Sequence, residues 1–402
     1  MTPLLRRLSA ILAFGLAALS AQAQPDPPDW TGVLAEARGQ TVYWHAWGGS
    51  SATNDFIAWL GDLVAERYGV TLEHVKLTDT ADAVTRVLAE KQAGVDTDGA
   101  VDLIWLNGAN FTAMKQRELL FGPFASDLPN HALVAGDDAI AVDFGEPVDG
   151  MESPWAKAQF VFMYDSADAR PLPSMQAILD WAVAHPGRIT YPQPPDFVGV
   201  TFLKQALVAL VDDPAILARP VSEVDFAAVS APLWDYLDRL TPVLWRQGRS
   251  YPASGPAQFQ LLADNEIDLA PSISPGEASA AIADFRLPST IRTFVPAEGT
   301  IGNASFVAIP YNSDAKAGAM VVANALLSPD VQLRAQDPDV LGYGTVLDMD
   351  KVPPEVAAAF ADQPRGPATL SPAELGTILP EPHASWVAAI EEEWSRRYGV
   401  TR

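Results

Sequence analysis

The sequence predicts an α/β fold with more than one domain. A chain of 402 residues is too long for one ordinary hydrophobic core, so two domains are expected. Strand-like apolar runs alternate with segments of helical periodicity along the chain, which is typical of α/β proteins. The first such unit, residues 42–64, contains a strand, a glycine turn and an amphipathic helix in that order.

This first unit is also the first candidate for a binding site. Residues 42–47 are bulky and read as a strand, the chain turns at Gly48 and Gly49, and Ser50 or Ser51 can cap a helix. The helix has one apolar face, formed by Phe56, Leu60, Leu63 and Val64. A helix N-terminus at the carboxyl end of a strand lies where ligands bind in open α/β sheets. The alternative is a plain strand–helix junction with a buried Trp47.

The first residues have the features of a secretory signal peptide. Arg6 and Arg7 form a positive segment, residues 8–19 are apolar, and residues 21–23 form a small-x-small cleavage site. We expect cleavage after Ala23 and export of the mature chain. The alternatives are a membrane anchor and a buried helix, although the apolar run is short for a stable span.

Composition narrows the functional classes. The chain has no cysteine, which excludes disulfides, thiolate chemistry and a lipid-modified cysteine anchor. The formal net charge of −24 argues against nucleic acid as a partner and favours cations. We expect a freely diffusing protein of a bacterial periplasm.

A second unit follows the first. Residues 70–77 read as a strand, Thr80 or Asp82 caps a helix, and residues 101–106 read as a strand covered on both faces. This strand ends at residues 107–110, where another helix starts. The pattern predicts a βαβαβ unit with two strand-to-helix turns on one side.

Residues 136–152 contain many acids and no base, and we interpret them as a surface crossing. The spacing of these acids does not match a calcium loop. A strand at 158–164 then leads toward the second domain.

The remaining chain repeats the alternation. We expect strands at 187–191, 265–270, 292–295 and 305–310 and helices at 174–181, 197–211, 226–240 and 315–327. One more helix begins at Pro275, and Ser328 caps another. Residues 298–303 and 341–345 read as loops, and residues 353–402 read as helices with proline breaks.

The order of these pieces resembles the periplasmic solute-binding proteins of ABC importers, in particular the subgroup with spermidine/putrescine-, thiamine- and iron-binding members. No single motif is specific, but the succession is, and it covers nearly all of the mature chain. The stretches that carry the resemblance are YWHAW at 43–47, VDLIWLNGAN at 101–110, GRITYPQPPDF at 187–197, NEIDLA at 265–270 and the run from 294 to LGYGT at 341–345.

The resemblance implies a type II periplasmic-binding-protein fold, with two α/β lobes and a ligand cleft between them. After the signal peptide at 1–23, it implies a first lobe at 24–153 and 297–345, a second lobe at 154–296, and C-terminal helices at 346–402. Hinge closure around a small solute would present the closed form to a permease in the membrane. We expect a monomer with no cofactor, no metal and no enzymatic activity.

The resemblance also implies ligand contacts. Trp47 matches an aromatic residue that stacks on the ligand, and Tyr343 and Asp196 match further contacts. The second strand turn contributes Asn107, Gly108 and Asn110. The other candidate contacts are Gly48, Ser50, Trp155, Phe197, Glu277 and Asn303. Each has a structural alternative: Trp155 and Phe197 as core residues, Glu277 as a first-turn acid on a helix dipole, and Asn303 as a turn residue.

Two differences from the family pattern bear on the identity of the solute. Residues 301–304 lack the Trp and Asp of polyamine binders, and there is no adjacent tyrosine pair as in iron binders. Arg188 and Lys204 are the only bases in the candidate stretches, which disfavours phosphates and dicarboxylates. We expect a small organic cation, such as a thiamine-like compound or an amine. Helix N-termini at Ser51 and Asn110 leave a zwitterion possible.

The main alternative is an exported hydrolase of the glycosidase kind that uses a carboxylate pair. The sequence contains neither GxSxG nor HExxH, and its five histidines are scattered without metal-ligand spacing. A periplasmic scaffold without a small ligand is a third possibility.

Overall fold

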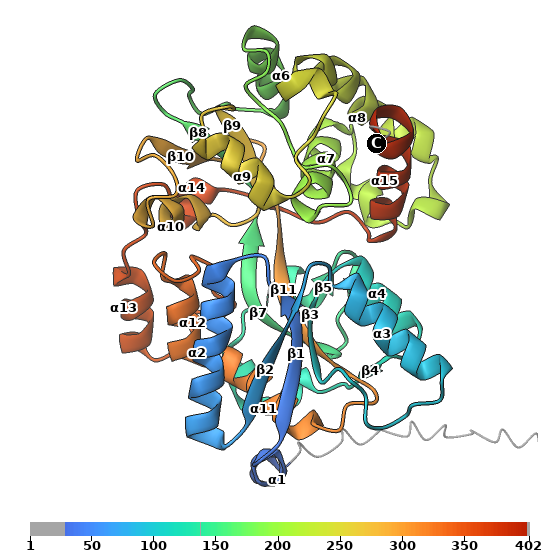
Figure 1. Ribbon diagram of the computed structural model, residues 1–402, viewed down its shortest axis with the longest axis vertical. Helices are drawn as coiled ribbons and strands as arrows, with labels where there is room; N and C mark the ends of the chain where they lie inside the picture. The colour runs from blue at the N-terminus through green and yellow to red at the C-terminus, as the bar shows by residue number, and fades with distance from the viewer. Residues whose placement is uncertain (1–28, 137, 400–402) are drawn as a thin grey trace, which may run out of the picture.

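The computed structural model describes residues 29–136 and 138–399. The predicted signal peptide lies outside the described residues. The chain forms two lobes, one above the other in Figure 1, with strands passing between them. None of the described helices combines the length and the apolar character that crossing a membrane requires.

Lobe 1 is built on a mixed sheet with the strand order β11-β3-β1-β2. Its strands are β1 (Thr41–Trp47), β2 (Thr71–Leu77), β3 (Leu103–Leu106), β7 (Glu152–Gln159) and β11 (Thr300–Pro310). β1 pairs in parallel with β2 and β3, as the βαβαβ pattern predicts. β11 pairs antiparallel with β3 and with β7, so it closes the sheet with a segment from late in the sequence.

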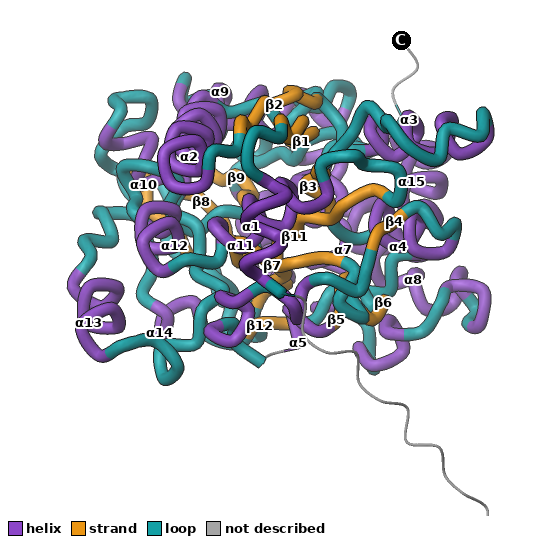
Figure 2. Tube along the Cα trace, turned by 90° about the horizontal axis from the view of Figure 1, so that it is seen from below, coloured by secondary structure: helices purple, strands orange, loops and turns teal. Residues whose placement is uncertain are grey.

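Helices cover both faces of this sheet. The helices of lobe 1 are α1 (Trp30–Ala37), α2 (Ser51–Tyr68), α3 (Ala81–Gln92), α4 (Ala109–Gln116), α11 (Lys316–Leu326), α12 (Pro329–Gln336) and α13 (Pro354–Asp362). Figure 2 shows α2 and α12 on one side of the strands and α3 and α4 on the other. The two sides have separate cores, because Val42, Trp44 and Ala46 of β1 pack toward α2, whereas Ile104 and Leu106 of β3 pack toward α3 and α4.

The helix after the first strand begins and ends where its residues predict. Ser50 caps α2 by accepting a hydrogen bond from the Thr53 amide at 3.4 Å. Gly69 ends the helix in a left-handed conformation with φ 71°, which glycine adopts without strain. The apolar face of α2 places Phe56, Leu60 and Val64 in the core of lobe 1.

Lobe 2 has a smaller sheet and is mostly helical. Its strands are β8 (Val161–Asp165), β9 (Leu269–Ser272) and β10 (Ile291–Phe294), in the order β10-β8-β9. Its helices are α6 (Met175–Ala184), α7 (Phe197–Leu210), α8 (Phe226–Leu240), α9 (Gly255–Ala263) and α10 (Glu277–Ala283). Phe162, Tyr191, Phe202 and Leu237 belong to one buried cluster in this lobe.

Three segments connect the lobes. β7 runs into β8 through Phe160, and β10 leads back into β11. The third segment leaves α13 in lobe 1 and reaches lobe 2 through α14 (Pro372–Leu375) and β12 (Ile378–Leu379). Short paired strands complete lobe 1: β4 (Leu120–Phe121), β5 (Val142–Asp143) and β6 (Glu146–Pro147), next to α5 (Asp138–Ala141).

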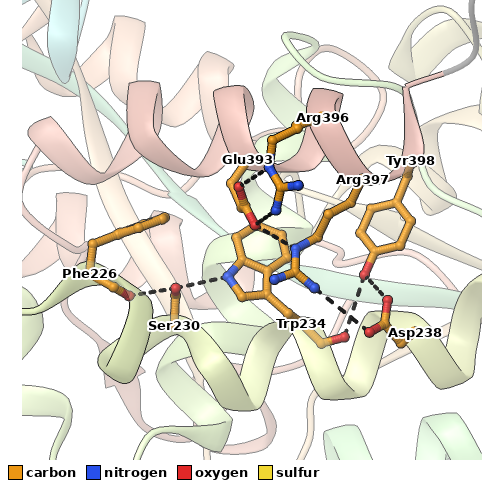
Figure 3. A network of polar contacts seen from close by, with 8 residues as sticks. All are labelled: Phe226, Ser230, Trp234, Asp238, Glu393, Arg396, Arg397 and Tyr398. Atoms are coloured by element: carbon orange, nitrogen blue, oxygen red, sulfur yellow. Dashed lines mark hydrogen bonds and ion pairs between the residues drawn. The ribbon is translucent and has the colours of Figure 1, made fainter.

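The last helix, α15 (Ser385–Tyr398), belongs to lobe 2, where Trp386, Ile390 and Trp394 join the buried cluster. Its end is tied to α8 by the polar network in Figure 3. The Tyr398 hydroxyl donates to Asp238 at 2.6 Å, and the Arg397 guanidinium lies 5.1 Å from the Trp234 ring. The helices after residue 345 are therefore divided between the lobes: α13 packs on lobe 1, and α15 packs on lobe 2.

Two expectations about local structure are wrong. The stretch 298–303 is predicted as a loop but lies mostly in β11. It is a strand because β7 and β12 pair with it, and its own sequence does not indicate this pairing. The stretch 187–191, predicted as a strand, forms only an isolated bridge between Ile189 and Leu269.

Candidate functional site

The carboxyl ends of β1 and β3 point toward lobe 2, so the turns that follow them lie between the lobes (Figure 1). Trp47 ends β1 and is partly exposed. Its indole covers Gly49 so closely that a Cβ there would lie 2.4 Å from the ring. Because glycine has no Cβ, the Trp47 ring can pack against the backbone of this turn, next to the α2 N-terminus that Ser50 caps.

An aromatic cluster lies beside this turn. Trp155 of β7 is 1% exposed, and the Trp105 ring meets it edge-on at 4.8 Å. The Tyr343 ring lies 5.8 Å from Trp155, and the Phe56 ring stacks on Trp155 at 6.1 Å. The indole Nε1 of Trp155 has no hydrogen-bond partner among the described residues. Trp155 thus holds the rings of Trp105 and Tyr343, which are partly exposed, in place.

Tyr343 belongs to lobe 1 and lies where this lobe meets lobe 2. Its hydroxyl lies beside Thr53 in the first turn of α2, and burial raises the pKa of Tyr343 to about 12. The hydroxyl therefore keeps its proton at neutral pH and can donate as well as accept a hydrogen bond. Glu277 of lobe 2 is an electrostatic neighbour of this hydroxyl.

Glu277 opens α10, and its carboxylate accepts a hydrogen bond from the Ser272 hydroxyl at 2.5 Å. Burial raises the pKa of Glu277, and the Ser272 hydrogen bond opposes the rise. Next to it the two lobes touch backbone to backbone. A Cβ on Gly276 would lie 2.5 Å from the Gly342 carbonyl oxygen, so glycine is what allows this approach.

The predicted contacts Asp196 and Phe197 start α7. Asp196 caps the helix: one carboxylate oxygen accepts from the amides of Val198 and Gly199, and the other accepts from the Gly255 amide at 3.1 Å. This carboxylate is therefore already engaged by its own lobe. Phe197 is 38% exposed, as an aromatic contact for a ligand would be.

The turn after β3 is tied to a residue that the sequence did not single out. Gly108 is buried at φ 60°, and its amide donates to an Asp143 carboxylate oxygen at 2.5 Å. The Phe144 ring fills the space that a Cβ on Gly108 would need. The side chains of Asn107 and Asn110 are half-buried and form no hydrogen bond within residues 29–136 and 138–399.

The interpretation of 136–152 as a surface crossing is wrong for two of its acids, although Asp149 is exposed. Asp143 is 1% exposed, because β5 and β6 form a hairpin that folds against lobe 1. Glu152 is fully buried at the start of β7, where it lies opposite Ala308 of β11. Glu152 has no hydrogen-bond partner among the described residues. Burial raises the pKa of Glu152 well above its ordinary value, because it disfavours the charged form of the carboxyl group.

A buried ion pair lies where this hairpin meets lobe 2. Lys204 of α7 is 1% exposed, and its ammonium lies 2.7 Å from Glu381. Glu381 also accepts a hydrogen bond from the Asn303 amide at 2.8 Å. The ammonium lies 4.2 Å from the centre of the Phe144 ring, so it joins lobe 2 to the hairpin of lobe 1.

Asp143 makes the stability of the protein depend on pH. Burial raises the pKa of Asp143 from 3.8 to about 8, so the folded protein holds a proton that the unfolded chain releases between about pH 4 and 8. We expect the free energy of unfolding to fall as the pH rises through this window, by up to about 1.4 kcal/mol per pH unit. Asp143→Asn should flatten the slope, because the amide keeps the shape of the neutral carboxyl group without a proton to lose.

Urea denaturation of both proteins across this pH range measures the two slopes. Glu152 contributes in the same direction, so a smaller slope should remain in the variant. Equal slopes in the two proteins would contradict the burial of an ionisable Asp143.

The structure thus brings the predicted residues into two groups. The first group belongs to the turn before α2, the aromatic cluster and the start of α10: Trp47, Gly48, Ser50, Trp155, Glu277 and Tyr343. The second group belongs to the turn after β3 and the surroundings of the Lys204–Glu381 pair: Asn107, Gly108, Asn110, Phe197 and Asn303. Trp105, Asp143, Phe144 and Glu381 were not predicted as site residues from the sequence. Trp105 stands in the quoted strand 101–106, and its place two residues before Asn107 could have indicated it.

Comparisons with known proteins agree with this architecture. A family profile described as bacterial extracellular solute-binding protein matches residues 60–361. Protein YnjB of Escherichia coli (strain K12) is 44% identical over 374 residues, which cover 92% of this chain and 94% of that protein.

Solved structures of lower identity share the fold. The periplasmic binding protein AfuA from Actinobacillus pleuropneumoniae, with fructose-6-phosphate bound, has a TM-score of 0.64 and 12% identity and covers 90% of this chain and 99% of its own. The spermidine/putrescine ABC transporter substrate-binding protein PotD from Streptococcus pneumoniae has a TM-score of 0.58 and 17% identity, covering 88% and 99%. The two-lobed fold predicted from the sequence is confirmed.

Proposed function

This chain belongs to the family of bacterial extracellular solute-binding proteins, and from this premise we propose that its solute is a small organic cation held between the lobes. The protein is a solute-binding component of an ABC transporter, and we propose that it delivers the bound solute to the permease subunits. The family is one of transport proteins and gives no support to the hydrolase alternative.

The observation that carries the cation proposal is the close approach of the Gly276 and Gly342 backbones, which places Glu277 of lobe 2 and Tyr343 of lobe 1 next to the same contact. One lobe offers an acid and the other an aromatic hydroxyl, next to the point where Gly276 and Gly342 touch. Trp47 and Trp105 add aromatic faces, on which a cation gains roughly 0.5–2 kcal/mol. A charge-assisted hydrogen bond to Glu277 would add to this.

The two bases of the candidate stretches do not favour an anion. Lys204 is already paired with Glu381, and the Arg188 guanidinium is bonded to Asp268 within lobe 2. An anionic solute that bound either of them would have to compete with a formed ion pair. The α2 N-terminus could still hold one anionic group of a zwitterion.

Calorimetric titration with organic cations and with matched anions tests this proposal. A thermal-shift screen of small molecules would first supply candidates, because a binder raises the melting temperature by mass action. Trp47→Ala should then weaken binding of the cation about 2- to 30-fold, the equivalent of roughly 0.5–2 kcal/mol.

Trp47→Phe is the matched control, since it keeps an aromatic face and should retain most of the affinity. An unchanged affinity in Trp47→Ala would remove Trp47 from the site. Binding of anions alone would refute the cation proposal.

We also propose that the mature chain starts at Gln24 and works in the periplasm as a monomer. Arg6, Arg7 and the 21–23 cleavage pattern support export. Both walls of the candidate site come from one chain, so the site needs no second copy. N-terminal sequencing of the soluble periplasmic fraction should read Gln24 first, and a membrane-bound form that keeps Met1 would contradict export.

A further inference from the structure

Lys204 is a buried cation with ligand-like surroundings. Its ammonium lies 2.7 Å from Glu381, 4.2 Å from the Phe144 ring and 5.7 Å from the Phe197 ring. A carboxylate with two aromatic rings is the arrangement that proteins use to hold an ammonium ligand. We call Lys204, Phe144, Phe197, Glu381 and Asn303 the Lys204 cluster.

The cluster is assembled from parts of the chain that are far apart. Phe144 comes from the β5–β6 hairpin of lobe 1, Phe197 from the first turn of α7 in lobe 2, and Asn303 from the connecting strand β11. The hairpin is fixed to lobe 2 because the Phe144 carbonyl accepts from the Ala384 amide at 2.8 Å. The cluster therefore lies at the lobe interface, where the fold places a solute.

The cluster and the hairpin next to it hold buried side-chain oxygens without a hydrogen-bond partner among the described residues. These are the Asn303 side-chain oxygen and one Asp143 carboxylate oxygen. Glu391 is a further acid that acts on Lys204. Glu381 and these buried oxygens would therefore attract a cation to this end of the interface if Lys204 were absent.

We propose that Lys204 is a specificity-determining residue whose ammonium fills a cation subsite from within the chain. The solute should therefore carry a single positive charge, which binds at the Glu277–Tyr343 end. This consequence rests on the proposed function. A linear diamine would need a second subsite, and Lys204 occupies it.

Lys204→Ala tests the subsite directly. The substitution removes three carbons and the nitrogen, which are the atoms of n-propylammonium. We expect n-propylammonium chloride to raise the melting temperature of Lys204→Ala by about 2 °C or more, because the ion binds the emptied subsite of the folded state. The wild type and Lys204→Met, whose side chain fills the space without a charge, should show no such rise.

Neutral n-propanol and sodium chloride at equal ionic strength are the controls for apolar and salt effects. A melting temperature of Lys204→Ala that does not respond, or an equal rise in the wild type, would overturn the inference. If Lys204→Ala is insoluble, refolding with and without the amine replaces the melting experiment. Recovery only with n-propylammonium supports the subsite, and recovery that does not depend on it overturns the inference.

A second titration separates this inference from the proposed function. Linear diamines of increasing length are titrated into the wild type and into Lys204→Ala, with the corresponding monoamines as controls. A gain of about tenfold or more in diamine affinity in the variant supports both proposals. If n-propylammonium stabilises Lys204→Ala but the affinity of the variant for diamines does not rise, the subsite is supported. The same result refutes a cation at the Glu277–Tyr343 end.

Discussion

Glu381→Gln is expected to lower the free energy of unfolding by about 3–5 kcal/mol at neutral pH, because it leaves the Lys204 ammonium buried without a counter-charge. Burial already lowers the pKa of Lys204, and Glu381 opposes this shift. In the variant the folded state would favour neutral Lys204, whereas the unfolded chain keeps it charged up to about pH 10. The loss of stability should therefore shrink as the pH rises toward 10.

Urea denaturation at several pH values measures this effect. The double variant Lys204→Met/Glu381→Gln is the matched control, because it removes both charges and fills the same space. It should recover most of the stability. If the double variant has the same free energy of unfolding as Glu381→Gln, the pair contributes to stability through its packing and not through its charge.

Gly276→Ala should weaken solute binding about 10- to 100-fold with little effect on the stability of the free protein. The added Cβ would lie 2.5 Å from the Gly342 carbonyl oxygen, so the lobes could not come as close as they do here. The backbone at Gly276 has φ −88°, which alanine adopts freely, so the substitution adds no local strain. Apparent affinity falls with the fraction of molecules that can close, which is the basis of the expected loss.

Calorimetry gives the affinity, and small-angle X-ray scattering shows whether the solute still compacts the protein. Gly136→Ala is the control, since a Cβ at that exposed glycine meets nothing within 4 Å. Unchanged binding in Gly276→Ala would mean that the Gly276–Gly342 contact plays no part in closure.

Local signals made much of the fold predictable. Ser50 and Gly69 mark the ends of α2, and the spacing of Phe56, Leu60 and Val64 indicates its buried face. The strand β11 was harder to predict. Its first residues, TIGN, resemble a loop, and they are a strand only because β7 and β12, distant in sequence, pair with them.

The candidate site was predictable where it depends on strand ends and not where it depends on long-range pairing. Trp47 ends β1 and Asn107 directly follows β3, so both lie at the carboxyl edge of the lobe 1 sheet. Asp143 stands in an acid-rich stretch that reads as surface, and its burial follows from the folding of a hairpin. Glu381 lies 177 residues after Lys204, and no local pattern indicates that these two residues form a buried pair.

Neither lobe is formed by one continuous stretch of the chain, so neither lobe can be completed early during synthesis. The core of lobe 1 includes Phe360, and the core of lobe 2 includes Trp386 and Trp394. A chain emerging from the ribosome therefore lacks essential core residues of both lobes until nearly all of it has been made. Such a chain stays unfolded, and so able to be threaded through a translocation pore, for longer than one whose N-terminal domain is contiguous.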